Sequence, residues 1–276
     1  VYKRQEILEP LLTHPSADVR SRGVWAIPRR SNDAAEVAPA FLRALRDSSE
    51  QVRMAAFWRF PRTRPRPSVY DDSIAARLIE LIDSPLASDR DDALSLVGTF
   101  HPQGRLAVPR AMQIAESRGD SVWIREAAIR LLVRQVPPRE LMPTLLRLLD
   151  DSVGRVRYSA LLSIRHVGVD GLTQPEIDEV IARVESQLGS YDPARMSIEA
   201  AELLITLRAR DALLRAVGPF SSVRSIAFRG LSHFANDTAI DRPLLAALAH
   251  TNTRRLAALA LVGAGPRVER ALDSIV

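Results

Sequence analysis

An arginine-centred pattern recurs along this chain and constrains its fold more than any other feature. Each clear copy has Val or Ile before the arginine, a small residue three positions after it, and apolar residues four and seven positions after it. In QVRMAAFWRF (51–60), Ala56, Phe57 and Phe60 follow Arg53 at these offsets. The other clear copies begin at Arg20, Arg125, Arg157 and Arg224, two weaker copies begin at Arg90 and Arg255, and a degenerate copy has Ser197 in the arginine position.

This spacing predicts α-helices. At about 100° per residue, offsets 0, +3, +4 and +7 lie within an arc of roughly 100°, which is one face of a helix. The copies recur every 27 to 40 residues, the period of helical solenoid repeats. Most copies follow another apolar-periodic segment, so each unit is predicted to be a helix A, a turn and a helix B. The helix A segments are 37–47, 74–83, 141–150 and 242–250. We therefore expect an all-α, right-handed α-solenoid of about eight two-helix repeats.

One copy resembles the HEAT repeat family over a whole repeat. LLRLLDDSVGRVRYSALLSI (145–164) has leucines, an aspartate closing helix A, and then Val–Arg and alanine opening helix B. Pro39 and Pro143 each stand 14 residues before the arginine of their copy, as does the proline of helix A in that family. The resemblance implies a HEAT-like solenoid and leaves the activity open, because one fold hosts many functions.

The resemblance predicts a single solenoid domain over residues 6–276. Residues 1–5, VYKRQ, resemble a translated adapter sequence and are expected to be a non-native leader on a chain truncated at its N-terminus. No apolar run reaches the roughly 18 residues of a membrane span, and the N-terminus lacks the apolar core of a signal peptide. A cytoplasmic location is therefore expected.

The recurrence of the arginine favours a structural role for Arg53. Its stem would be buried, and its guanidinium would reach the aspartate that closes helix A, six or seven residues upstream. Asp47, Asp83 and Asp150 stand at such positions. Capture of a phosphate or carboxylate ligand is the functional alternative for the same side chain.

The exposed side of helix B is the predicted binding surface. Offsets +2, +5 and +9 point away from the packed face, and this side lines the concave surface in the solenoids that the chain resembles. Tryptophan and arginine gather there, as in protein-interface hot spots and in nucleic-acid stacking platforms. Trp25 and Trp58, one repeat apart, could instead cover an end of the core exposed by the truncation. The predicted partner-binding residues are Arg22, Trp25, Trp58, Arg59, Arg62, Arg130 and Arg229. Arg29 and Arg62 follow Pro28 and Pro61, which could end the helix before them.

The net charge of +5 is unevenly distributed. Residues 19–69 contain eleven arginines and four acids, whereas residues 71–92 contain seven acids and two arginines. A continuous positive groove over 19–69 would indicate nucleic acid, and neutralisation by the acidic section would favour a protein partner. The loop PRTRPRPSVY (61–70) could grip phosphates or simply space two repeats.

The sequence offers little catalytic chemistry. The absence of cysteine excludes disulfides, thiolate metal sites and cysteine nucleophiles. No phosphate-binding glycine loop, metalloprotease motif or serine-hydrolase motif occurs, and the five histidines are scattered over different repeats. We therefore predict no catalytic residue, no metal site and no cofactor.

Two enzymatic families share the architecture. Trp25, Trp58 and Trp123 superficially resemble the groove tryptophans of HEAT-like alkylpurine DNA glycosylases, but Arg29, Arg62 and Ala127 stand where a carboxylate is expected. HEAT-like subunits related to phycobilin lyases share only the repeat. The function expected from the sequence is a non-catalytic HEAT-repeat scaffold that binds a protein partner on its concave face. The alternative is a nucleic-acid-binding HEAT-like protein related to the alkylpurine DNA glycosylases.

Overall fold

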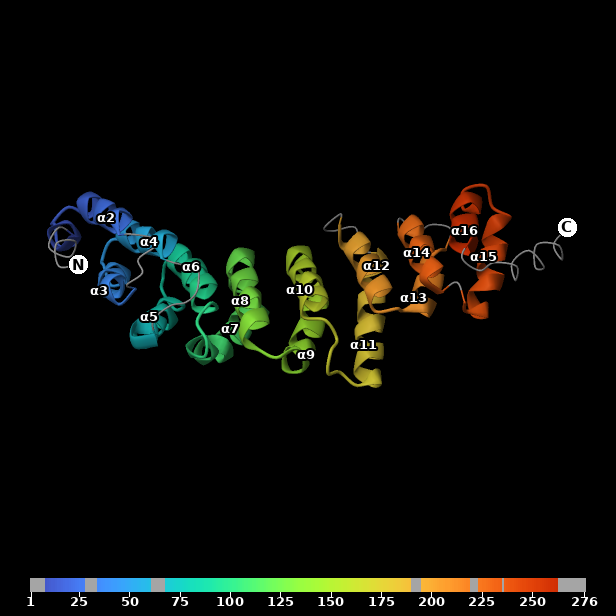
Figure 1. Cartoon of the computed structure of the whole chain (residues 1–276), viewed down its shortest axis with the longest axis horizontal. Helices are drawn as coiled ribbons and strands as arrows, with labels where there is room; N and C mark the ends of the chain where they lie inside the picture. The colour runs from blue at the N-terminus through green and yellow to red at the C-terminus, as the bar shows by residue number, and fades with distance from the viewer. Residues whose placement is uncertain are drawn as a thin grey trace. The chain divides into compact units, whose positions relative to one another are not determined.

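The computed structural model describes residues 8–27, 34–60, 68–189, 195–218, 223–234 and 236–262. All regular structure in these residues is helical, with no β-strand among them. The chain divides into two compact units, residues 1–137 and residues 138–276. Figure 1 labels the helices of both units. Within the described ranges, no helix is both long enough and apolar enough to cross a lipid bilayer.

The N-terminal unit is built from two series of helices. The B helices pack in succession, α2 on α4, α4 on α6 and α6 on α8. Their bounds are α2 (Ala17–Ala26), α4 (Glu50–Arg59), α6 (Ala87–Val97) and α8 (Val122–Gln135). The A series begins with α3 packed on α5, and the 3-10 helix η1 then joins α5 to α7. Its bounds are α3 (Ala34–Leu45), α5 (Ser68–Leu81), η1 (Gln103–Ala107) and α7 (Val108–Glu116).

The C-terminal unit repeats this arrangement. Its B helices, which also pack in succession, are α10 (Gly154–Val167), α12 (Met196–Thr206), α14 (Arg224–Leu231) and α16 (Arg254–Leu261). Its A helices are α9 (Pro138–Leu149), α11 (Gln174–Glu185), α13 (Arg210–Ala216) and α15 (Asp241–Leu248). Three short 3-10 helices complete the unit: η2 (Ser186–Gly189), η3 (Ser232–Phe234) and η4 (Thr238–Ile240).

The helices lie where the repeated pattern predicts them. Every anchor position of the pattern falls in the first turn of a B helix, and every predicted A segment overlaps an A helix. Pro39 and Pro143 lie inside α3 and α9, as the resemblance implies. In the copy headed by Arg53, Ala56, Phe57 and Phe60 are buried. The all-α fold and its paired helices are therefore confirmed.

The register predicted for the last copy is wrong. With Arg255 as the anchor, Leu259 and Val262 should be buried, but they are 60% and 77% exposed. The buried residues are Ala257, Ala260 and Leu261. Arg254 fits better as the anchor, because Ala257 and Leu261 at +3 and +7 are buried, while Ala258 at +4 is exposed. Its Nε donates to the carbonyl oxygen of Leu248 at 2.9 Å.

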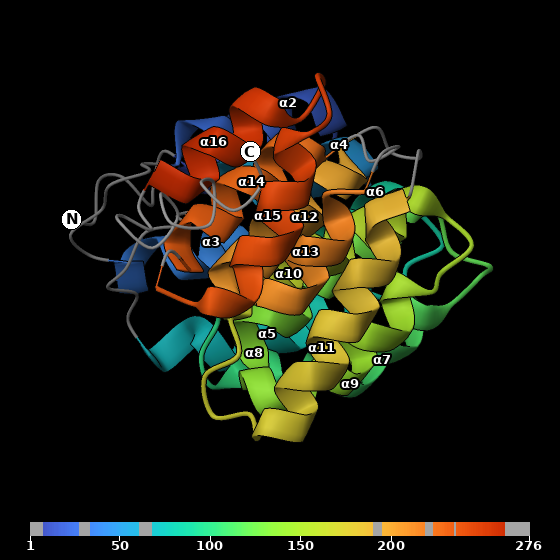
Figure 2. The ribbon, with the colours of Figure 1, turned by 90° about the vertical axis from the view of Figure 1, so that its right-hand side faces the viewer.

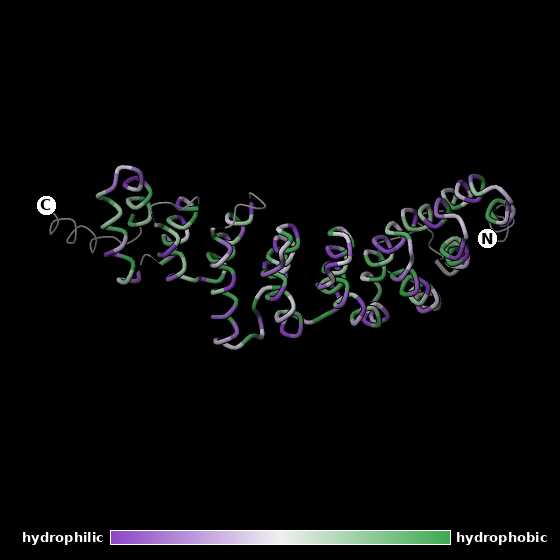
Figure 3. Tube along the Cα trace, turned by 180° about the vertical axis from the view of Figure 1, so that it is seen from behind, coloured by the Kyte–Doolittle hydropathy of each residue, from purple (hydrophilic) through white to green (hydrophobic). Residues whose placement is uncertain are grey.

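Apolar residues of both series form the core. Green hydrophobic and purple hydrophilic stretches alternate along the helices in Figure 3, as expected for helices with one buried face. In the N-terminal unit, Phe60 meets Phe41 edge-to-face with ring centroids 5.2 Å apart, and its centroid lies 5.8 Å from that of Phe100. These rings come from α3, from the residue that caps α4 and from the turn after α6, so they join successive repeats.

The recurring arginine has the structural role that its recurrence favours, but the predicted acceptor is wrong. Arg53 Nη1 donates to the main-chain carbonyl oxygens of Asp47 and Ser48, at 2.8 and 2.9 Å, and not to the Asp47 carboxylate. The same contact, with the carbonyl six residues upstream, is made by Arg20, Arg157, Arg224 and Arg254. Asp47, Ser48, Asp151 and Gly218 follow the ends of α3, α9 and α13, so the arginines that contact them satisfy carbonyls of the turn between helix A and helix B.

In the N-terminal unit, the carboxylates that pair with Arg20, Arg53 and Arg90 come from the following repeat. Asp47 accepts from Arg20, with Nε–Oδ2 at 2.7 Å, whereas Asp83 and Asp150 pair with Arg110 and Arg183. In the N-terminal unit the anchors form a row of three forward ion pairs, Arg20–Asp47, Arg53–Asp89 and Arg90–Asp120. We call this row the arginine ladder. It connects the start of each B helix to the start of the next.

Candidate partner-binding surface

Trp25 and Trp58 project from neighbouring helices of the N-terminal unit. They occupy the same offset after their anchors on α2 and α4, which pack against each other, and they are 49% and 58% exposed. Met54, one helical turn before Trp58, is 39% exposed on the same side of α4. We call Trp25, Met54 and Trp58 the aromatic patch. Sequence reasoning missed Met54 because it considered only offsets +2, +5 and +9, although the i, i+4 spacing from Trp58 was visible.

Two predicted arginines lie beside this patch. Arg22 pairs with Asp18 on the same helix, with Nη2–Oδ2 at 2.9 Å, and both side chains are exposed. Arg59 Nε donates to the carbonyl oxygen of Ile27 at 2.7 Å. Because Ile27 ends α2 and Arg59 ends α4, this bond ties together the two helices that carry Trp25 and Trp58.

Arg130 belongs to the same unit but lies on α8. It pairs with Asp91 of α6, with Nη2–Oδ1 at 3.5 Å. Burial raises the pKa of the Asp91 carboxyl, the positive charge of Arg130 opposes this shift, and the negative charge of Glu126 adds to it. Arg130 therefore pairs with a half-buried carboxylate between two B helices.

The remaining predicted residues lie apart from the patch. Arg229 is on α14 in the C-terminal unit, where it forms an ion pair with Glu202 of α12. Arg62 and residues 61–67 of the arginine-rich loop lie outside the described residues, and α5 begins at Ser68. The structure thus brings Arg22, Trp25, Trp58 and Arg59 together on adjacent helices.

The described arginines of the basic section are largely paired with acids. A positive groove would require these charges to remain uncompensated. The ion pairs are Arg20–Asp47, Arg22–Asp18, Arg43–Glu9 and Arg53–Asp89. Asp89 belongs to the acidic section 71–92. Hydrogen bonding from Arg20 lowers the pKa of the Asp47 carboxyl, which keeps it ionised. Neighbouring carboxylates therefore compensate this part of the basic section.

The described residues assemble little catalytic chemistry. No three His, Asp or Glu side chains come together there in an arrangement that could hold a metal ion. Trp123 is 60% exposed near the start of α8, and Ala127, one turn later, is fully buried. That position therefore offers no carboxylate to a base stacked on Trp123.

Comparison with solved structures relates the chain to other helical-repeat proteins. No protein-family model and no curated protein matches it. The X-ray structure of Escherichia coli YibA aligns over 96% of this chain and 92% of its own, with 16% identity and a TM-score of 0.55. An engineered protein aligns over 94% of this chain and 78% of its own, with 17% identity and a TM-score of 0.51. These similarities show the fold, a HEAT-like helical solenoid.

A weaker likeness involves the complex of CpcE and CpcF of phycocyanin lyase from a Nostoc species. It covers 93% of this chain and 94% of the matched chain, with 15% identity and a TM-score of 0.46. A likeness at this level carries no argument about activity.

Proposed function

We propose that the chain is a non-catalytic HEAT-like scaffold that binds a protein partner through the B-helix side of its N-terminal unit. The observation that carries this proposal is the aromatic patch. Two tryptophans and a methionine, the largest apolar side chains of α2 and α4 outside the core, are each at least 39% exposed. Tryptophan is enriched among the residues that dominate binding energy at protein interfaces.

The contacts around the patch support preorganised binding. The bond from Arg59 to Ile27 and the buried ion pair between Arg53 and Asp89 fix α2, α4 and α6 to one another. A surface that is already rigid loses less conformational entropy when a partner binds. The exposed Arg22–Asp18 pair at the edge supplies a polar rim.

The pairing of the arginines favours a polypeptide over nucleic acid. Binding to a phosphate backbone draws its affinity from cations that neutralise phosphates and release counterions. Here Arg20, Arg43 and Arg53 are engaged by carboxylates of the chain. DNA or RNA would therefore have to displace these ion pairs or rely on other arginines, such as the exposed Arg46, which pairs with no carboxylate among the described residues.

A photo-crosslinking experiment tests the protein-partner proposal. Met54 is replaced by benzoylphenylalanine, and covalent products formed in the cells that express the chain are identified by mass spectrometry. The matched control carries the same group at Leu106, which is 75% exposed on η1, away from α2 and α4. The purified partner is then titrated by calorimetry against the unmodified chain, Trp25→Ala and Trp58→Ala.

We expect a crosslink from position 54 that is absent from position 106, and a loss of affinity of about tenfold or more for each tryptophan substitution. Equal affinity for the three chains would contradict the proposal.

The nucleic-acid alternative is tested by fluorescence anisotropy with labelled duplex and single-stranded DNA at several salt concentrations. Tight binding with a steep salt dependence that both tryptophan substitutions weaken would replace the protein-partner proposal.

A further inference from the structure

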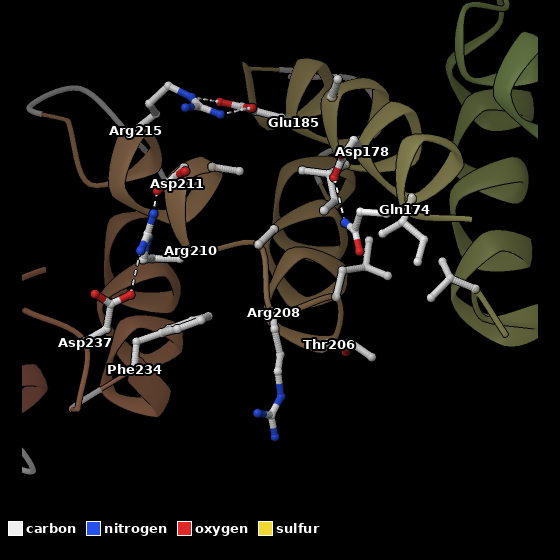
Figure 4. Close-up of a pocket in the computed structure, with 17 residues that line it drawn as sticks. Gln174, Asp178, Glu185, Thr206, Arg208, Arg210, Asp211, Arg215, Phe234 and Asp237 are labelled. Carbon is white, nitrogen blue, oxygen red and sulfur yellow. Dashed lines mark hydrogen bonds and ion pairs between the residues drawn. The ribbon is translucent and has the colours of Figure 1, made fainter. Parts of the chain in front are cut away.

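The C-terminal unit contains a groove of about 720 Å³ between α11 and α13 (Figure 4). Unequal helix lengths create it, since α11 has 12 residues and α13 has seven. Arg215 and Glu185 hold the C-terminal ends of these helices together, with Nε–Oε1 at 2.5 Å and Nη2–Oε2 at 2.7 Å. At about 1.5 Å per residue, α11 therefore extends past the start of α13 by more than one helical turn. Figure 2 shows α11, in yellow, as a long helix near the shorter α13.

Partly exposed apolar side chains line this space. Ile177 and Ile181 stand one turn apart on α11, and Leu207 and Phe234 contribute from the turn after α12 and from η3. Asp178 lies at the edge on α11, where it accepts a hydrogen bond from Gln174 at 2.9 Å. The groove thus offers an apolar floor with a polar rim, the usual composition of a ligand site.

The three arginines that line the groove differ in their partners. Arg215 is bound to Glu185, and Arg210 bridges two carboxylates, with Nε–Oδ1 of Asp211 at 2.7 Å and Nη1–Oδ2 of Asp237 at 2.6 Å. Arg208 is exposed, and no carboxylate among the described residues pairs with it. In Figure 4 its side chain extends from the turn after α12, away from these ion pairs. Its guanidinium is therefore available to an anionic ligand.

Arg208 also occupies a backbone position that disfavours a side chain. Its φ is 51°, in the left-handed region. The N–H of Arg208 donates to the carbonyl of Ile205 and the N–H of Ala209 donates to that of Leu204, so a helix-terminating turn closes around it. Glycine is the residue that adopts this conformation at least cost. An arginine here sacrifices stability, a pattern typical of functional positions.

We propose that this groove binds a short peptide segment of a partner protein, in which an acidic residue stands beside apolar residues. The peptide carboxylate pairs with Arg208, because a planar guanidinium matches a carboxylate in two parallel hydrogen bonds. The apolar side chains cover Ile177, Ile181 and Phe234. Asp178 at the edge disfavours a second acidic residue at that end. This site lies in the other unit and shares no residue with the aromatic patch. Either proposal can therefore be wrong without affecting the other.

A displayed library of random 12-residue peptides, selected on the immobilised full chain, supplies the probe. The most enriched peptide is labelled and titrated by fluorescence anisotropy. The variants are Arg208→Gly, which removes the guanidinium, and Ile181→Ser, which removes part of the apolar floor. Arg242→Ala on α15 is the matched control, because Arg242 is exposed in the same unit and does not line the groove. Thermal unfolding of each variant is recorded alongside.

We expect enriched peptides to combine Asp or Glu with Leu, Ile or Phe. Arg208→Gly should weaken binding at least about tenfold while the thermal midpoint stays or rises, because glycine relieves the left-handed turn. Arg242→Ala, Trp25→Ala and Trp58→Ala should leave the affinity unchanged. The proposal is overturned if no peptide is enriched, if Arg208→Gly binds as well as the unmodified chain, or if Arg208→Gly lowers the thermal midpoint.

Discussion

Arg53 and Asp89 form an ion pair that joins two successive repeats while both side chains are buried. Arg53 is 7% exposed and Asp89 is 2% exposed, and Nη2 lies 2.8 Å from Oδ2. Ser84 donates a further hydrogen bond to the same carboxylate at 2.9 Å. The carbonyls of Asp47 and Ser48 accept from the other side of the guanidinium. Both the guanidinium and the carboxylate of this pair are therefore engaged by further partners inside the N-terminal unit.

Removing one partner of this pair should destabilise the fold strongly. Arg53→Ala leaves the Asp89 charge buried without its counterion, so we expect a loss of about 3–5 kcal/mol in the free energy of unfolding. The measurement is urea denaturation followed by circular dichroism. The double variant Arg53→Met, Asp89→Leu should recover much of the loss, since it leaves no unpaired buried charge. Additive losses in the double variant would show that the two groups act separately.

The exposed pair Asp83–Arg110 is the matched control. Its side chains are 59% and 44% exposed. Water solvates both charges after the pair is broken, so Arg110→Ala should cost less than about 1 kcal/mol. A loss as large as that of Arg53→Ala would show that burial is not the cause of the difference.

Asp47 should make the fold sensitive to acid. Its pKa is lowered by hydrogen bonding to Arg20, so its contribution is complete above the unfolded-state pKa of about 3.9 and is lost as the pH falls through the lower pKa of the folded state. Asp47→Asn should therefore be less stable than the unmodified chain at pH 7. The gap should shrink as the pH falls below about 4. Urea denaturation between neutral and strongly acidic pH measures this, and a gap independent of pH would contradict the assignment.

Asp91 should make the folding stability depend on pH in the opposite direction. Burial raises its pKa, so folding disfavours its charged form, and the penalty is present above the folded-state pKa and disappears below the unfolded-state pKa. Asp91→Asn should therefore be at least as stable as the unmodified chain at pH 7, with the advantage vanishing in acid. A clear loss of stability at pH 7 would instead show that the pairing with Arg130 outweighs the burial.

Two leucines on α16 test the corrected register of the last repeat. Leu261 is buried and Leu259 is 60% exposed. Leu261→Ala should cost about 2–5 kcal/mol because it leaves a cavity, whereas Leu259→Ala should change stability by less than about 0.5 kcal/mol. Thermal and urea unfolding of both variants decide the point, and the reverse order would restore Arg255 as the anchor.

Gly104 on η1 should not tolerate a side chain. A β-carbon there would lie 2.6 Å from the carbonyl oxygen of Val97 and 2.7 Å from Nε2 of Gln135, which itself donates to the carbonyl of Gly98 at 2.8 Å. Gly104→Ala should therefore lose about 1–3 kcal/mol through overpacking. Gly189→Ala is the control, because a β-carbon at that position meets no atom within 4 Å.

The positions of the helices could be read from the sequence because burial repeats at helical spacing. In the copy of Arg157, Ala160, Leu161 and Ile164 are all buried, so the pattern and the packing coincide. The register of the last copy was predicted incorrectly because RRLAALALV (254–262) has apolar residues at the pattern positions after both Arg254 and Arg255. Only the contacts of α16 distinguish them.

The partners of the arginines were beyond sequence reasoning for a different reason. Repeat lengths vary between 27 and 40 residues, so no fixed offset connects Arg20 to Asp47 or Arg53 to Asp89. The groove could not be predicted from the sequence either. It depends on α13 being shorter than α11 and on a left-handed backbone conformation at Arg208, where a glycine would have been the usual signal. The exposed tryptophans were found because their offset from the anchor places them opposite the buried face.

The arginine ladder gives the stack a direction. Each arginine of the ladder contacts a main-chain carbonyl of its own repeat and an acid of the repeat that follows, so each of these three boundaries has a donor on its earlier side and an acceptor on its later side. A gene duplication that copied one whole repeat would copy both the arginine and the acid of these ion pairs. At the new boundary, the arginine of one copy would meet the acid of the next copy without a compensating mutation. Such an array can therefore lengthen one repeat at a time.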